Sequence, residues 1–181
     1  VGLHMRMGDV ATGGPTHREE EWQKAGLKTL GVLANALRIL AHVQVSGLRA
    51  RIVSDSSAED IAKALAESYG VRLDGARKAL YGSVALDFVT GGNPLVALHC
   101  IASNDVLLGL CDASSPIVKG VYYAEDARQD DRCSKFYVAG MLLSRGDVFA
   151  IPATPLGPDA LLSYASRIAS SLNATSDGRP A

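Results

Sequence analysis

The chain opens with the stretch VGLHMRMGD (residues 1–9), in which a short apolar strand runs directly into the polar pattern His-x-Arg-x-Gly-Asp. Ligands of α/β folds bind at the carboxyl ends of parallel strands. This strand end carries an imidazole at His4, a guanidinium at Arg6 and a carboxylate at Asp9. We expect Arg6 to face a phosphate, because a guanidinium can donate two parallel hydrogen bonds to one anion.

Short apolar segments alternate with helical patterns over the rest of the chain. Further strands are expected at residues 49–54, 105–109 and 147–151, with a strand or an irregular run at 84–89. Helices are expected at residues 17–45, between Ser56 and Gly70, at 94–103 and at 158–172. Such alternation predicts a parallel sheet that is covered on both faces. The predicted fold class is therefore α/β, a Rossmann-like doubly wound parallel sheet.

Two helix starts carry local signals. Ser56 is followed three residues later by Glu59, which is the spacing of a capping box. Asn93 stands directly before Pro94, and this pair is typical of a cap followed by the first helical position. Each signal predicts where a helix begins without reference to the rest of the chain.

The length and charge of the chain limit the possible functions. The 181 residues suit one domain, expected at residues 1–172 with a polar tail at 173–181. The net charge of −1 gives no broad electrostatic case for a nucleic-acid partner. No run of about 18 apolar residues is present, so we expect no membrane-spanning segment. Because the chain begins in a core-type strand, we also expect it to start within a larger protein.

The three cysteines do not form a metal or redox motif. None belongs to a C-x-x-C pair, and no His, Cys or Asp cluster has the spacing of metal ligands. No metal site is therefore expected. Cys100 lies in an apolar helical run and is interpreted as a core thiol. Cys111 and Cys133 are compatible with a disulfide in an oxidising compartment, and the sequence leaves that open.

Polar residues follow three of the expected strands. The first strand supplies His4 and Arg6, the second Asp55, and the third Ser114 and Ser115 ahead of a helix start. The carboxyl ends of parallel strands share one edge of a sheet. Hydroxyl and amide groups at a helix N-terminus donate well to phosphates, and a carboxylate accepts from the N–H edge of guanine. This combination predicts a pocket for a nucleoside diphosphate.

Each of these residues also has a structural interpretation. Asp55 with Ser56 could cap a helix, and Ser114 with Ser115 could cap another. His4 could be a structural histidine at a strand end, and Arg6 could pair with Asp9. The pocket lacks both the G-x-G-x-x-G pattern of dinucleotide sites and the lysine of phosphate-binding loops.

Four motifs in order resemble the GDP-fucose fucosyltransferases of the α1,2-, α1,6- and protein O-linked group. HMRMGD (residues 4–9) resembles the H-x-R motif of that family, and VSDS (53–56) its A-T-D-[DS] strand end. HCIASNDVLLG (99–109) is similar to its L-x-x-[AQ]-D-x-x-[IV]-G segment, and Ser114-Ser115 to its S-S-F element. Together the motifs span residues 1–120, the nucleotide-sugar half of a GT-B glycosyltransferase in that family.

The resemblance implies a role for each matching residue. Arg6 would be catalytic, because it would neutralise the β-phosphate of the departing GDP. His4 and Asp55 would contact the guanosine, while Ser114 and Ser115 would hydrogen-bond the pyrophosphate. The donor would be GDP-fucose and the reaction inverting, with no metal and no other cofactor.

The resemblance also implies partners and a compartment. The acceptor would be a glycan or a protein hydroxyl, held against an N-terminal domain that this sequence lacks. The compartment is not given by the sequence; it would be the Golgi or endoplasmic reticulum lumen if the source is eukaryotic.

The chain departs from the family pattern at three places. Met7 stands where some members have a second basic residue after the arginine. Pro116 stands where a phenylalanine follows the serine pair, and it removes one backbone N–H from the helix start. The loop at residues 10–15 contains no carboxylate to serve as a base. The alternative interpretation is therefore a non-catalytic Rossmann-like module, either a degenerate transferase that still binds nucleotide or a scaffold.

Overall fold

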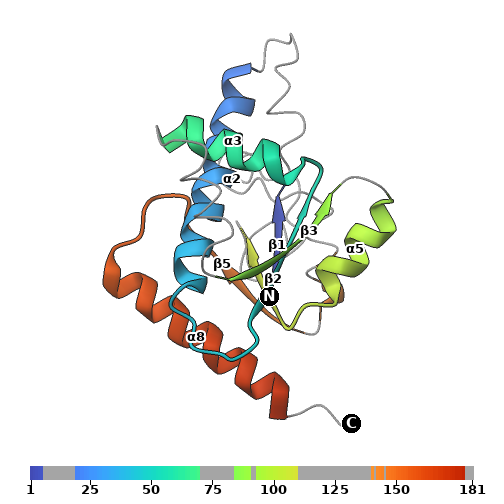
Figure 1. Ribbon diagram of the computed structural model, residues 1–181, viewed down its shortest axis with the longest axis vertical. Helices are drawn as coiled ribbons and strands as arrows, with labels where there is room; N and C mark the ends of the chain where they lie inside the picture. The colour runs from blue at the N-terminus through green and yellow to red at the C-terminus, as the bar shows by residue number, and fades with distance from the viewer. Residues whose placement is uncertain are drawn as a thin grey trace, which may run out of the picture.

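The computed structural model describes residues 1–5, 19–69, 84–90, 93–109, 140, 142–144 and 146–177, with only the backbone for 19–28, 68–69 and 175–177. Its centre is a five-stranded sheet in which every pair of neighbouring strands is parallel (Figure 1). Helices flank this sheet, so the arrangement is α/β and Rossmann-like. The fold class expected from the alternation of strands and helices is confirmed at this level.

The elements follow one another in the order β1 (Gly2–Met5), α2 (Glu19–Leu40), β2 (Arg49–Ser54), α3 (Ala58–Tyr69), β3 (Ala85–Thr90), α5 (Pro94–Ala102), β4 (Val106–Gly109), β5 (Asp147–Ala150) and α8 (Pro158–Asp177). Across the sheet the strands lie in the order β3-β2-β1-β4-β5. The chain therefore moves outward from β1 to β3, and then returns to place β4 on the other side of β1. This reversal makes the gap between β1 and β4 the topological switch point of the sheet.

The helices divide between the two faces of the sheet. Helix α2 packs against α3 and α8, whereas α5 contacts β1 and β2 from the opposite face (Figure 1). The larger core lies under α2, α3 and α8, where Leu33, Ile61 and Ile168 are fully buried. Helix α2 buries Leu33, Leu37 and Leu40 at helical spacing, which explains why this stretch folds onto the sheet.

A buried asparagine fixes the loop between β5 and α8. Asn35 of α2 is 2% exposed, and its Nδ2 donates to the carbonyls of Pro152 and Thr154, each at 2.7 Å. Its Oδ1 accepts from the Leu156 N–H at 3.3 Å. One turn earlier, Gly31 lets the loop backbone approach so closely that a Cβ there would collide with the Ala153 carbonyl. The loop is therefore anchored on α2.

Several boundaries match the sequence predictions. The strand at residues 49–54 is β2, and the uncertain run at 84–89 is a strand, β3. Helix α5 begins as expected, because the Asn93 side chain accepts from the Leu95 N–H at 2.9 Å and Pro94 follows it.

Three boundaries differ from the predictions. Helix α2 ends at Leu40 rather than 45, and the following residues form a turn in which Gly47 has a φ of 70°. Such a positive φ suits glycine, which has no Cβ to clash. Helix α8 continues to Asp177, so the tail expected from residue 173 is partly helical. The polar composition of this tail does not end the helix, because the first glycine or proline comes only at Gly178.

The third difference concerns the start of α3. Ser57 and Asp60 form the capping pair, in place of the expected Ser56 and Glu59. Ser56 is buried and donates its backbone N–H to Ser54 Oγ at 3.1 Å, so it belongs to the turn that leaves β2. The sequence is also compatible with a short strand at residues 71–73 and a helix from Pro116 to about Tyr123, and both segments lie outside the described residues.

Candidate functional site

The carboxyl ends of β1, β2 and β4 lie side by side. Met5 at the end of β1 is in register with Ser54 at the end of β2, and Leu3 is in register with Leu108 near the end of β4. Asp55 follows Ser54 directly, at the end of β2. The structure thus brings together the three strand ends that the sequence singled out, at the switch point of the sheet.

Of the expected site residues, His4 and Asp55 are described; Arg6, Ser114 and Ser115 lie outside the described residues. His4 is half-buried and alternates with the buried Leu3 and Met5 along β1. Because successive side chains of a strand point to opposite faces, His4 belongs to the face that carries α5, with Val53 as its register partner. It already takes part in an interaction within the protein.

Asp55 is exposed at the end of β2. The flanking serines Ser54 and Ser56 are 7% and 6% exposed, and the hydrogen bond from the Ser56 N–H to Ser54 Oγ closes the turn between them. This turn fixes the backbone on both sides of Asp55 and leaves its carboxylate at the surface. Like His4, Asp55 takes part in an interaction within the protein.

The start of α3, just beyond Asp55, is occupied by the protein's own carboxylates. Ser57 Oγ accepts from the Asp60 N–H at 3.1 Å and donates to Asp60 Oδ2 at 2.6 Å, while the Ser57 N–H donates to the same oxygen at 3.4 Å. Glu59 adds a second acid to this first turn. Carboxylates here compensate the positive end of the helix dipole, so this helix start disfavours a phosphate.

Neither a cluster of metal ligands nor a membrane-spanning helix is found in the described part of the chain. Within these ranges, no three His, Cys, Asp or Glu side chains gather in a way that could hold a metal ion. No described helix combines the length and the apolar character needed to cross a membrane. Cys100 is a half-buried free thiol on α5, and Cys111 and Cys133 lie outside the described residues.

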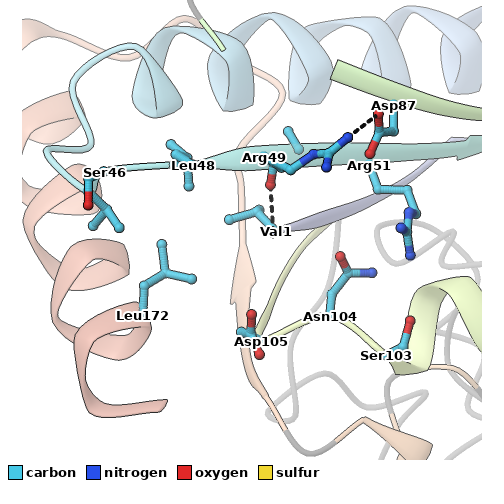
Figure 2. A pocket seen from close by; sticks show the side chains of 13 residues that line it. Val1, Ser46, Leu48, Arg49, Arg51, Asp87, Ser103, Asn104, Asp105 and Leu172 are labelled. Atoms are coloured by element: carbon cyan, nitrogen blue, oxygen red, sulfur yellow. Dashed lines mark hydrogen bonds and ion pairs between the residues drawn. The ribbon is translucent and has the colours of Figure 1, made fainter. Parts of the chain in front are cut away.

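A cavity of about 450 Å³ lies at the opposite edge of the sheet, where the strands begin (Figure 2). Arg49 at the start of β2 pairs with Asp87 of β3 at 3.2 Å, and Asn104 Nδ2 donates to the Cys100 and Ile101 carbonyls at the end of α5. The Val1 nitrogen donates to the Arg49 carbonyl at 3.0 Å.

This amino-edge cavity has a charged lining that is largely committed to the fold. Arg49 and Asp87 pair with each other, and Asp105 also takes part in an interaction within the protein. Sequence reasoning missed the cavity because it considered only the carboxyl ends of strands. The available signal was the pair of arginines, Arg49 and Arg51, at alternate positions of a core strand.

Comparisons of the chain with protein-family models, with curated proteins and with solved structures found no match. The chemistry of the carboxyl edge is therefore inferred from its own residues and from the register of its strands.

Proposed function

We propose that the chain is the nucleotide-sugar-binding half of a GT-B glycosyltransferase, which binds GDP-fucose for inverting transfer of fucose to a sugar or protein hydroxyl. The observation that supports this proposal is the adjacency of the ends of β1, β2 and β4 at the switch point. Three of the four sequence motifs reach this edge on those strands, and open α/β sheets bind their ligands there.

In this proposal the diphosphate lies over the gap between β1 and β4. The carboxylates at the start of α3 disfavour a phosphate at the end of β2. This supports a diphosphate on the side of β1 that faces β4. Arg6 would follow β1 directly and stabilise the charge that develops on the departing GDP. Ser114 and Ser115, beyond the end of β4, would hydrogen-bond the pyrophosphate, and His4 and Asp55 would contact the guanosine.

Calorimetric titration of the purified chain with GDP and with guanosine tests the proposal. We expect GDP to bind, and Arg6→Ala to weaken GDP binding by about 10- to 150-fold while leaving guanosine binding unchanged. That range corresponds to one charge-assisted hydrogen-bonding group, roughly 1.5–3 kcal/mol. Arg51→Ala, at the amino edge of the same sheet, is the matched control and should leave GDP binding unchanged.

Two results would contradict the proposal. The absence of GDP binding by the folded wild-type chain would exclude a GDP-sugar site and favour the scaffold alternative. An equal loss of GDP and guanosine affinity in Arg6→Ala would show that Arg6 supports the fold rather than the diphosphate.

A further inference from the structure

We propose that Asp55 recognises the ribose of the nucleotide, so that the site selects ribonucleotides over 2′-deoxyribonucleotides. This inference rests on the proposed function, because it assumes that a nucleoside diphosphate binds at the carboxyl edge. It goes beyond that function by assigning one group of the ligand to one carboxylate. The assignment follows from the position of Asp55 in the sheet and from the residues around it.

The position of Asp55 suits the ribose. Neighbouring strands lie about 4.8 Å apart, and Asp55 follows β2, the strand next to β1 on the side away from β4. The ribose attached to a diphosphate over the gap between β1 and β4 is therefore within reach of the end of β2. In doubly wound sheets that bind dinucleotides, an acid in the corresponding place accepts from a ribose hydroxyl.

The chemistry around Asp55 points to neutral donors. An ionised carboxylate only accepts hydrogen bonds, and two adjacent hydroxyl groups can both donate to it. Glu59 and Asp60 lie just behind it in the first turn of α3, and their charges oppose a phosphate but not a hydroxyl group. Recognition of the diphosphate at this strand end is therefore disfavoured.

The residues beside Asp55 in the chain favour the ribose over the base. The described residues next to Asp55 in the chain are Ser54, Ser56 and Ser57, whose side chains are small and polar. A purine ring needs flat apolar or aromatic walls on which to stack, and these serines offer none. The turn held by Ser54 and Ser56 presents the carboxylate on a fixed backbone, as discrimination of a single hydroxyl requires.

The test compares GDP with 2′-deoxy-GDP, which lacks one ribose hydroxyl, and with inosine diphosphate, which lacks the exocyclic amine of guanine. We expect wild type to bind 2′-deoxy-GDP about 10-fold or more weakly than GDP, the loss of one charge-assisted hydrogen bond. In Asp55→Asn, the affinity for GDP should fall towards the affinity for 2′-deoxy-GDP. The ratio of the affinities for GDP and inosine diphosphate should stay at its wild-type value.

Asp60→Asn is the matched control, because it alters a carboxylate of the adjacent helix cap. It should lower the melting temperature slightly and keep the discrimination against 2′-deoxy-GDP. If Asp55→Asn does not fold, the wild-type comparison of GDP with 2′-deoxy-GDP still tests whether the site reads the ribose hydroxyl, and equal affinities would still overturn the assignment.

Equal wild-type affinity for GDP and 2′-deoxy-GDP would overturn the ribose assignment while leaving the proposed function intact. Loss of the preference for GDP over inosine diphosphate in Asp55→Asn would do the same, because it would assign Asp55 to the base. Failure of every nucleotide to bind would overturn both proposals.

Discussion

On the face of the sheet under α2, α3 and α8, strand register aligns an apolar row of Phe88, Ile52, Leu3, Leu108 and Phe149. On the face that carries α5, the adjacent row contains Asp87, Arg51, Gly2, Leu107 and Val148. All five side chains of the first row are apolar. The second is charged at one end and apolar at the other.

This difference separates the part of the sheet that stabilises the fold from the part that can carry polar chemistry. Burial of apolar surface contributes roughly 25 cal/mol per Å², and most of the buried Leu and Ile side chains lie on the first face. The face with α5 has fewer such side chains and admits His4, Arg51 and Asp87. We expect stability to depend chiefly on the apolar face.

Adjacent leucines of β4 provide the most direct test of this comparison. Leu108 is 0% exposed on the apolar face, and Leu107 is 1% exposed on the face with α5. Leu108→Ala should reduce the free energy of unfolding by about 4 kcal/mol, and Leu107→Ala by roughly 2–3 kcal/mol, within the range for buried leucines. Urea denaturation of both variants measures the two losses, and a larger loss for Leu107→Ala would reverse the ranking of the faces.

The variant Asn35→Ala tests how much the buried Asn35 side chain stabilises the apolar face. Asn35→Ala removes the donors to the Pro152 and Thr154 carbonyls and the acceptor of the Leu156 N–H. We expect a loss of about 2–3 kcal/mol in thermal or urea unfolding, because buried backbone groups lose their partners. Arg38→Ala, at an exposed position one turn further along α2, removes only the long 3.5 Å hydrogen bond from Arg38 Nη1 to Asn35 Oδ1 and should cost far less. Equal losses of stability in the two variants would show that the hydrogen bonds from Asn35 to the loop do not stabilise the fold.

The ion pair between Arg49 and Asp87 should have the smallest effect. Their side chains are 70% and 39% exposed, so solvent screens the interaction. A double-mutant cycle with Arg49→Gln and Asp87→Asn should give a coupling of about 0.2–1 kcal/mol that decreases with added salt. A coupling well above this range would mean that the charged row contributes to stability as the apolar row does.

Features encoded by neighbouring residues could be predicted from the sequence. The short strand at residues 49–54 and the helix start at the Asn93-Pro94 pair depend on a few neighbouring residues, and both predictions are confirmed. The cap of α3 shows where local signals fail. Ser56 with Glu59 and Ser57 with Asp60 have the same spacing, and the burial of Ser56 against the end of β2 decides between them. That burial is a tertiary effect, which spacing alone does not reveal.

The candidate site also has features that the sequence predicts and features that it does not. The common edge of the strand ends could be predicted, because parallel strands require it. The side of β1 on which each partner lies could not, because the pairing of Gly2 with Leu107 joins residues far apart in the chain. The face occupied by His4 follows from the two-residue period of β1, once Leu3 and Met5 are known to be buried. The roles of Arg6, Ser114 and Ser115 stay predictions.

The central place of β1 affects how the molecule folds. Strand β1 needs both β2 and β4 as neighbours, and three crossover connections separate β1 from β4 along the chain. The β1-β2-β3 half can assemble while the chain is still being synthesised, but its inner edge stays unpaired until β4 arrives. Pairings over such long sequence separations carry a large loop-closure entropy and slow the search for the native state. During this interval the open edge of β1 is the surface most exposed to pairing with another chain.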